Sequence, residues 1–162
     1  MNRFSGFTLI ELMITLAVAA ILVTIAVPGM VTLVQNSRTT SQTNELVSAL
    51  NLARSEAVKR GRTVTVRAEG GGFADGWCVH QGSVCPDVNH DDRIRVYPPM
   101  NRMVVEPGVS QVVFTPQGAL EGDNPVTLRI YPQDCGPVTE NRARTLTVDV
   151  TGRVNVNRTN CS

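Results

Sequence analysis

Hydrophobic positions form three successive patterns along the chain, and the first is a long apolar run. Residues 7–34 are almost continuously apolar, and Glu11 is the only formal charge among these 28 residues. At ~1.5 Å per residue a helix of this length extends about 42 Å, which exceeds the ~30 Å hydrocarbon core of a bilayer. The run therefore predicts a helix that is able to span a membrane.

The second pattern is an apolar stripe at helical spacing, which follows the polar stretch 35–45. Its spacings of four, three and four residues are typical of a helix packed on a core. Gly61 is a natural stop, because glycine adopts the left-handed conformation that ends many helices. One long helix is expected over residues 7–60. The stripe consists of Leu46, Leu50, Ala53 and Ala57, and the charged residues that fall mostly on the other face are Arg54, Glu56, Lys59 and Arg60.

The third pattern consists of short alternating segments that Pro and Gly separate, and it predicts strands from residue 62 onward. No helical pattern lies between them, so the sheet is expected to be antiparallel. The fold class is α+β, with a long N-terminal helix packed on an antiparallel β-sheet domain. The predicted strands are residues 62–67, 76–80, 93–97, 103–106, 111–115, 126–131, 145–150 and 153–156.

Composition narrows the possible functions. The chain has 162 residues, of which 42% are hydrophobic and 18% charged, so intrinsic disorder is excluded. A net charge of +1 and an aromatic content of 4% argue against a protein built to bind nucleic acid over its whole surface. The sequence has two histidines and no catalytic triad, phosphate-binding loop or dinucleotide fingerprint. A protein without enzymatic activity, and with no cofactor or metal, is expected.

Glu11 separates three interpretations of the apolar run. A secretory signal peptide has a shorter apolar region of roughly 7–15 residues and a small-residue cleavage site, which is not evident here. A simple membrane anchor accounts for the length of the run but not for a carboxylate, which costs about 2.5–3.5 kcal/mol at the centre of a membrane helix. The third interpretation rests on the residues around Gly6.

The sequence Gly6-Phe7-Thr8-Leu9-Ile10-Glu11-Leu12, after the short leader 1–6, resembles the class III signal of type IV pilins and pseudopilins. The resemblance implies that a membrane-bound prepilin peptidase cleaves after Gly6 and that Phe7 is then N-methylated. It also implies that Glu11 pairs with the N-terminal amine of a neighbouring subunit during assembly. A buried carboxylate is tolerated when a buried cation meets it, which is consistent with this pairing.

The signal divides the chain into a cleaved leader (1–6), a transmembrane and filament-core helix (7–34) and a head domain (35–162). Arg3 is the only basic residue before the apolar run, which weakly favours a cytoplasmic leader. A single-pass precursor in the bacterial inner membrane is expected, with its head in the periplasm and later in an extracellular filament. Pro28-Gly29 should kink or locally melt the helix. It is either a tolerated membrane proline or a segment that unwinds during assembly.

The remaining sequence resembles the GspH/FimT family of minor pilins and pseudopilins. That resemblance implies a structural component of a type IV pilus, in a tip or priming complex, whose partners are other major and minor pilins. The alternatives are a pseudopilin of a type II secretion system and a DNA-binding minor pilin for DNA uptake. The motifs that carry the resemblance are residues 44–58, Gly76-Trp77 with Val79, Phe114-Thr-Pro-Gln-Gly118 and Gly152-Arg153-Val154.

Four cysteines allow either disulfides or a metal site. Cys78 and Cys85 flank a short loop, so they are expected to pair, which leaves Cys135 to pair with Cys161; two other pairings remain open. A zinc site is the competing interpretation, with Cys78, His80, Cys85 and His90 as ligands. Their spacing is not that of a standard zinc finger, and disulfides form outside the cytoplasm.

The acidic segment 87–92 resembles the first half of a calcium loop. It lacks the glycine at loop position six and has Pro98 where position twelve requires glutamate. A polar hairpin tip is the preferred interpretation, and ion binding remains the alternative.

Charge is unevenly distributed along the head. Residues 38–67 carry a net charge of +4, residues 69–123 carry −5, and residues 126–162 carry +2. Some FimT-type members bind DNA through a C-terminal G-R-x-R pattern, but here Asn155 replaces the second arginine. Phosphate contacts depend on charge more than on position, so other arginines could compensate. The candidate DNA contacts are Arg153, Arg158, Arg142 and Arg144, and the alternative is a face complementary to a neighbouring subunit.

Overall fold

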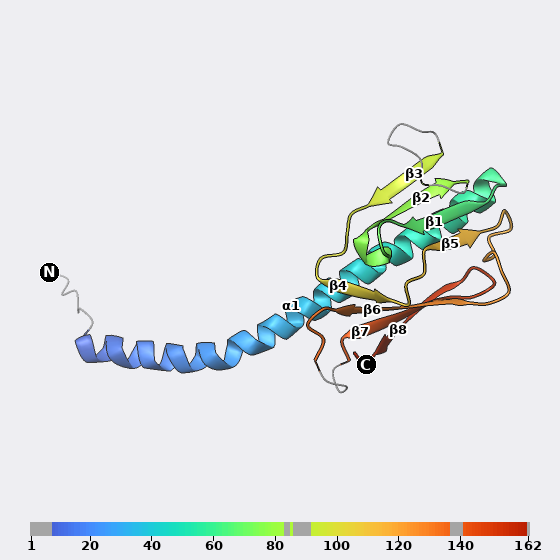
Figure 1. The fold of residues 1–162 in the computed structure, drawn as a ribbon. Coiled ribbons are helices and arrows are strands. Elements are labelled where there is room, and N and C mark those ends of the chain that lie inside the picture. Colours follow the sequence, from blue (N-terminus) through green and yellow to red (C-terminus); the bar gives the residue numbers. More distant parts are fainter. Residues whose placement is uncertain (1–7, 83–84, 86–91, 137–140, 162) are drawn as a thin grey trace. The chain divides into compact units, whose positions relative to one another are not determined.

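The computed structural model describes residues 8–82, 85, 92–136 and 141–161, without the side chains of residues 28, 29, 31 and 32. The chain divides into two compact units, Met1–Ser37 and Arg38–Ser162, and the long helix α1 passes from the first into the second (Figure 1). The elements are α1 (Leu9–Arg60), β1 (Val64–Ala68), the 3-10 helix η1 (Phe73–Asp75), β2 (Trp77–Gln81), β3 (Arg93–Tyr97), β4 (Met103–Glu106), β5 (Gln111–Phe114), β6 (Val126–Pro132), β7 (Ala143–Val148) and β8 (Val154–Thr159).

The helix α1 ends where the sequence predicts. Gly61 has φ +61°, its N–H bonds to the carbonyl of Val58 at 3.4 Å, and the N–H of Arg62 bonds to the carbonyl of Ala57 at 3.2 Å. These two bonds form a Schellman motif, which satisfies carbonyls at the end of the helix. The predicted glycine stop is confirmed.

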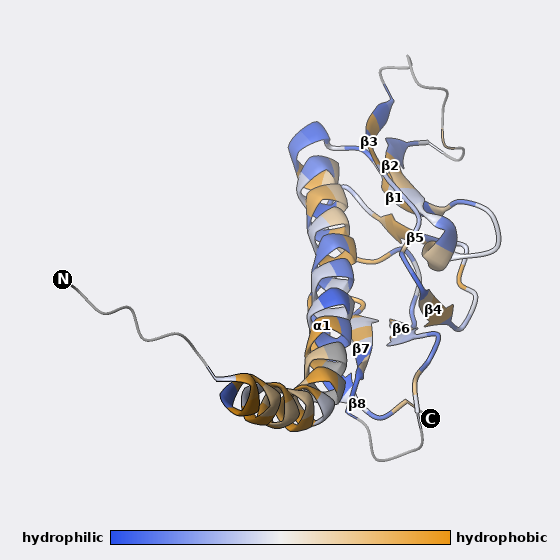
Figure 2. Ribbon diagram, turned by 90° about the vertical axis from the view of Figure 1, so that its left-hand side faces the viewer, coloured by the Kyte–Doolittle hydropathy of each residue, from blue (hydrophilic) through white to orange (hydrophobic). Residues whose placement is uncertain are grey.

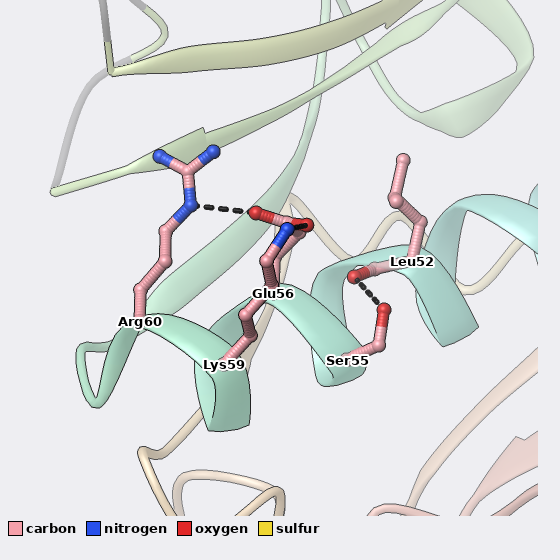
Figure 3. Close-up of polar contacts among 5 residues, drawn as sticks. All are labelled: Leu52, Ser55, Glu56, Lys59 and Arg60. Atoms are coloured by element: carbon pink, nitrogen blue, oxygen red, sulfur yellow. Dashed lines mark hydrogen bonds and ion pairs between the residues drawn. The ribbon is translucent and has the colours of Figure 1, made fainter.

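An ion pair stabilises the last turns of α1 (Figure 3). The carboxylate of Glu56 accepts a 2.6 Å bond from Nε of Arg60 and lies 3.6 Å from Nζ of Lys59. The bond from Arg60 is the main cause that lowers the pKa of Glu56. The hydroxyl of Ser55 donates to the carbonyl of Leu52 at 2.8 Å. The carboxylate of Glu56 thus contacts both basic side chains of the last turn.

The core of the second unit forms between α1 and the strands. All four residues of the predicted apolar stripe are fully buried. They belong to one hydrophobic cluster with residues from strands β1 to β7, among them Trp77, Phe114 and Leu128. Every member of the cluster lies in Arg38–Ser162. The head therefore has a core of its own.

The strands form two antiparallel four-stranded sheets rather than one. The strand orders are β3-β2-β1-β5 (sheet A) and β4-β6-β7-β8 (sheet B). The single sheet expected from the sequence is thus corrected, although the α+β, pilin-like fold class is confirmed. Periodicity identifies strands but not their partners, and here β5 returns to pair with β1 while β4 pairs with β6.

Strand β7 begins two residues earlier than predicted. The prediction covered residues 145–150, but Asp149 opens a turn in which the N–H of Gly152 bonds to its carbonyl at 2.7 Å. At the other end Arg142 and Arg144 are buried, and their charge hid the start of the strand from a hydrophobicity pattern. By contrast, β3 and β4 have the predicted bounds.

The helix α1 continues through Pro28 and Gly29 without interruption. The isolated chain therefore shows no local melting at Pro28-Gly29, and the prediction of local melting is wrong for the isolated subunit. Unwinding during assembly stays a prediction.

Candidate functional site

The apolar helix begins with a cap that involves Glu11. The N–H of Glu11 donates to Oγ1 of Thr8 at 3.3 Å, and the N–H of Leu12 donates to the carbonyl of Thr8 at 3.2 Å. Thr8 is therefore the N-cap, and Glu11 occupies the third helical position, as in a capping box. A carboxylate here is also favoured by the positive end of the helix dipole. Gly6 and Phe7, the predicted cleavage and methylation positions, lie outside the described residues.

The side chains of residues 9–27 are all exposed. Leu9–Val27 has a mean hydropathy of 2.6, none of it is buried, and it is the one helix among the described residues long and apolar enough to cross a membrane. The hydroxyls of Thr15 and Thr24 donate to carbonyls three residues earlier, at 2.8 and 2.7 Å. Their donors are therefore satisfied within the helix, without a hydrogen bond to water. In Figure 2 the ribbon of the first half of α1 is coloured mostly as hydrophobic. An exposed apolar surface requires lipid or other apolar helices around it.

Two disulfides reinforce the head. One joins Cys78 in β2 to Cys85 in the segment after it, and the other joins Cys135, after β6, to Cys161 near the C-terminus. The sulfurs of Cys78 and Cys85 are thus bonded to each other and are not available as zinc ligands. The carboxylate of Glu69 lies near this disulfide. His90 and residues 87–91 of the calcium-like segment lie outside the described residues.

Two of the four candidate DNA-contact arginines are buried. Arg142 is 8% exposed and donates to the carbonyl of Asp134 at 3.2 Å. Arg144 is 4% exposed and donates to the carbonyl of Ala143 at 2.9 Å and to Oγ1 of Thr40 in α1 at 3.1 Å. Their guanidinium groups serve internal hydrogen bonds, so the prediction that they compensate as phosphate contacts is wrong for this structure.

Arg153 and Arg158 are exposed, but they do not form one cluster. Arg153 closes the β7–β8 hairpin and Arg158 lies near the far end of β8. At ~3.3 Å per residue the five steps between them span roughly 16 Å. The pair therefore offers two separate positive charges along one strand.

Arg129 is a feature that the sequence analysis missed. Its Nη2 donates to the carbonyl of Cys161 at 2.8 Å, and its guanidinium lies 5.1 Å from the ring centroid of Tyr131 on the same strand. Together with the Cys135–Cys161 disulfide, this contact holds the C-terminal segment against sheet B. The two-residue spacing of Arg129 and Tyr131 in a strand was the available signal.

His80 is the one described histidine, and it is completely buried in β2. Its Nδ1 lies 3.1 Å from the carbonyl of Gln81, while its Nε2 has no hydrogen-bond partner in the part of the chain that the structure describes. Burial lowers the pKa of this imidazole, and the nearby Arg67 lowers it further. The arrangement favours a neutral histidine in the core.

Comparison with protein families gives two matches. Residues 42–152 match the model of the type II transport protein GspH, and residues 1–27 match the prokaryotic N-terminal methylation motif. No curated protein sequence matches the chain significantly.

Solved structures share the fold of the chain. The type IV minor pilin FimU of Pseudomonas aeruginosa superposes with a TM-score of 0.62 at 21% identity, covering 75% of this chain and 89% of FimU. A second crystal form of FimU gives 0.59 at 22% identity, covering 73% of this chain and 91% of FimU. The minor pseudopilin EpsH of the Vibrio cholerae type 2 secretion system gives 0.53 at 16% identity, covering 75% of this chain and 97% of EpsH.

Proposed function

The chain belongs to the GspH family of minor pilins and pseudopilins, and from this premise we propose that it is a minor pilin of a type IV pilus that acts in the priming or tip complex. Members of this family are structural proteins, so the chain is not an enzyme. Anchoring in the inner membrane and processing by a prepilin peptidase follow from the methylation motif and the apolar helix.

One observation carries the proposal: the apolar surface of Leu9–Val27 is fully exposed in the isolated chain and carries a single carboxylate at its start. Lipid covers such a surface before assembly, and the helices of other subunits cover it afterwards. Transfer between the two is possible because both environments are apolar. The helix is therefore the assembly element, and the head presents a surface to neighbouring subunits.

Glu11 supplies the specificity of this transfer. Cleavage after Gly6 would create a charged amine at Phe7, four residues before Glu11. A carboxylate in an apolar helix bundle is costly unless a cation meets it, so subunits whose amine and carboxylate coincide are favoured over those out of register. The Thr8 cap leaves the Glu11 side chain exposed to meet such a partner.

Counting sheared surface pili tests the proposal. In a strain that lacks the gene and cannot retract filaments, pili should disappear or fall sharply in number, and the wild-type gene should restore them. Complementation with Glu11→Gln should fail to restore pili although the leader is still cleaved. Thr15→Val is the matched control, because it changes a polar residue of the same helix whose hydroxyl serves only its own backbone.

An unchanged pilus number would contradict the pilus assignment and favour a pseudopilin of a type II secretion system. The family model and the EpsH superposition support this second candidate. Loss of protein secretion in the same strain would identify it.

DNA capture is the remaining candidate, and the exposed Arg153 and Arg158 support it. Arg153→Ala should then abolish duplex binding by the protein while leaving filaments intact. Binding should also fall steeply with salt, because phosphate contacts release counterions. A gel shift that is absent or insensitive to salt would eliminate this candidate.

A further inference from the structure

The two sheets have four edge strands, and β8 is the one least protected against pairing. β3 is followed by Pro98-Pro99 and pairs with β2 through a bulge, and the four-residue β4 is followed by Pro107. The edge of β5 is covered, because the N–H of Glu121 bonds to the carbonyl of Val113 at 2.8 Å. β8 has six residues, no bulge in its register with β7, and no proline in or beside it. Bulges, prolines and covering segments are the usual protection of sheet edges.

The open side of β8 presents backbone groups at three positions. In the hairpin the N–H of Asp149 bonds to the carbonyl of Arg153 at 2.9 Å, which fixes the alternation of inward and outward groups. Given the register of β7 and β8, Val154, Val156 and Arg158 direct their N–H and C=O groups away from β7. No described segment pairs with this side of β8, which is the last strand of sheet B.

Arg158 adds an uncompensated charge to the same edge. It is exposed and stands opposite Arg144 in the strand register, so the two side chains share a face. Burial, and the charge of Arg158, lower the pKa of Arg144. Among the described residues neither guanidinium has a carboxylate partner. An anion bound beside Arg158 would reduce the repulsion between these two positive charges.

We propose that the β8 edge binds an extended segment of another pilin subunit, which adds a strand to sheet B and places a carboxylate against Arg158. Charge complementarity favours an acidic protein segment: residues 69–123 of this chain already carry a net −5, so a head of similar charge distribution offers such segments. The inference rests on the proposed function, because it defines what a neighbouring subunit contributes. Main-chain bonds provide affinity, and the carboxylate provides selectivity.

A peptide experiment tests the edge on the full-length protein in detergent micelles. The probe is a fluorescent peptide of alternating threonine and valine with one central glutamate. Two further versions of this peptide carry N-methyl groups on alternate residues, one on the odd-numbered and the other on the even-numbered positions. Alternate N–H groups of a strand point to the same side, so only one of the two versions loses the N–H groups that bond to β8. We expect one version to lose at least tenfold in affinity and the other to bind nearly as well as the parent. Amide hydrogen exchange should slow at Val154, Val156 and Arg158 when the parent peptide binds.

The charge contribution is tested in the same assay. Replacing the glutamate of the peptide by glutamine, or Arg158→Gln in the protein, should each weaken binding by about tenfold, the effect of one charge-assisted hydrogen bond. Arg158→Gln removes the positive charge that repels Arg144 on the neighbouring strand, so this variant should remain folded. Arg153→Gln is the matched control: an exposed arginine of the same hairpin that should leave peptide binding unchanged.

Three results would overturn the inference. They are equal weakening by both methylated versions, unchanged exchange at the three amides at millimolar peptide, and a duplex oligonucleotide that binds through Arg158 while the peptide does not. The last result would assign the arginine to phosphate. Each is measured without filaments, so it is independent of the pilus count that tests the proposed function.

Discussion

The α-carbon of Gly152 packs directly against the carbonyl oxygen of Gly118, so that a β-carbon at position 152 would overlap this oxygen. Gly118 ends the turn after β5 in sheet A, and Gly152 lies in the β7–β8 hairpin of sheet B. Nε of Arg54 donates to the same oxygen at 2.9 Å, and its Nη2 donates to the carbonyl of Thr151 at 3.1 Å. One contact therefore joins α1 and both sheets.

Gly152→Ala should destabilise the head strongly. The residue has φ +76°, which costs an L-residue about 1–2 kcal/mol, and the overlap with Gly118 adds a cost of roughly 1–3 kcal/mol. We expect a loss of about 3 kcal/mol in the free energy of unfolding, measured by urea denaturation of the purified protein. Gly61→Ala is the control, since Gly61 has φ +61° but open space around it and should lose only about 1 kcal/mol. Equal losses for both variants would show that the contact contributes nothing.

Arg54→Lys should loosen the junction between the helix and the two turns. Lysine keeps the charge but cannot reproduce two bonds from one planar guanidinium, so one of the two carbonyls loses its donor. A loss of about 1–2 kcal/mol in unfolding free energy is expected. The exposed Arg62→Lys should change stability by less than about 0.5 kcal/mol. If Arg54→Lys left the free energy of unfolding unchanged, water would be replacing the guanidinium without cost.

The junction also shows what the sequence could and could not predict. The stripe of Leu46, Leu50, Ala53 and Ala57 and the stop at Gly61 were predictable, because helical period and the αL cap are local properties. Arg54 was assigned to the polar side of the helix by its charge, yet it donates to two turns more than 60 residues away in sequence. Hydropathy carries no information on such a bond, since carbonyls occur at every residue.

Burial of charge accounts for the other misassignments. Arg142 and Arg144 were predicted as surface contacts because arginine is rarely buried. Here the carbonyls of Asp134 and Ala143 and the hydroxyl of Thr40 solvate them inside the head. The same two residues concealed the start of β7. The methylation motif over residues 1–27 was predictable because its signal is contiguous, whereas the edge of β8 depends on strand order, which periodicity leaves open.

Removal of the Cys135–Cys161 disulfide should cost more stability than removal of Cys78–Cys85. The first bridge closes a segment with a sequence separation of 26 residues and the second one of 7. Loop entropy in the unfolded chain then gives about 3.6 and 2.5 kcal/mol, respectively. Paired Cys→Ser variants compared by urea denaturation test this order, and mass mapping of tryptic peptides without reduction tests the pairing. Peptides that link Cys78 to Cys135 or Cys161 would contradict it.

Acid should weaken the head through His80. The pKa of this buried imidazole is lowered in the folded state, so the unfolded chain binds a proton first as the pH falls. Folding stability due to neutral His80 is therefore fully present above the ordinary histidine pKa of about 6.5 and is lost as the pH falls from there through the lower folded value. The protonated ring would carry an additional buried N–H at Nε2, which has no acceptor among the described residues.

Thermal melts between pH 7.5 and pH 5 test this assignment. The melting temperature of the wild-type protein should fall over this range, while that of His80→Gln should change much less, because glutamine does not titrate. His90→Gln is the matched control, since it removes the second histidine and should retain the wild-type pH dependence. The groups around His80 shift its pKa in opposite directions. Burial and Arg67 lower the pKa, whereas the Gln81 carbonyl and Asp92 raise it. Asp92→Asn should therefore lower the folded-state pKa of His80 further, so that the loss of stability still begins near the ordinary histidine pKa but becomes larger at pH 5. A smaller acid-induced loss than in the wild-type protein would contradict the assignment.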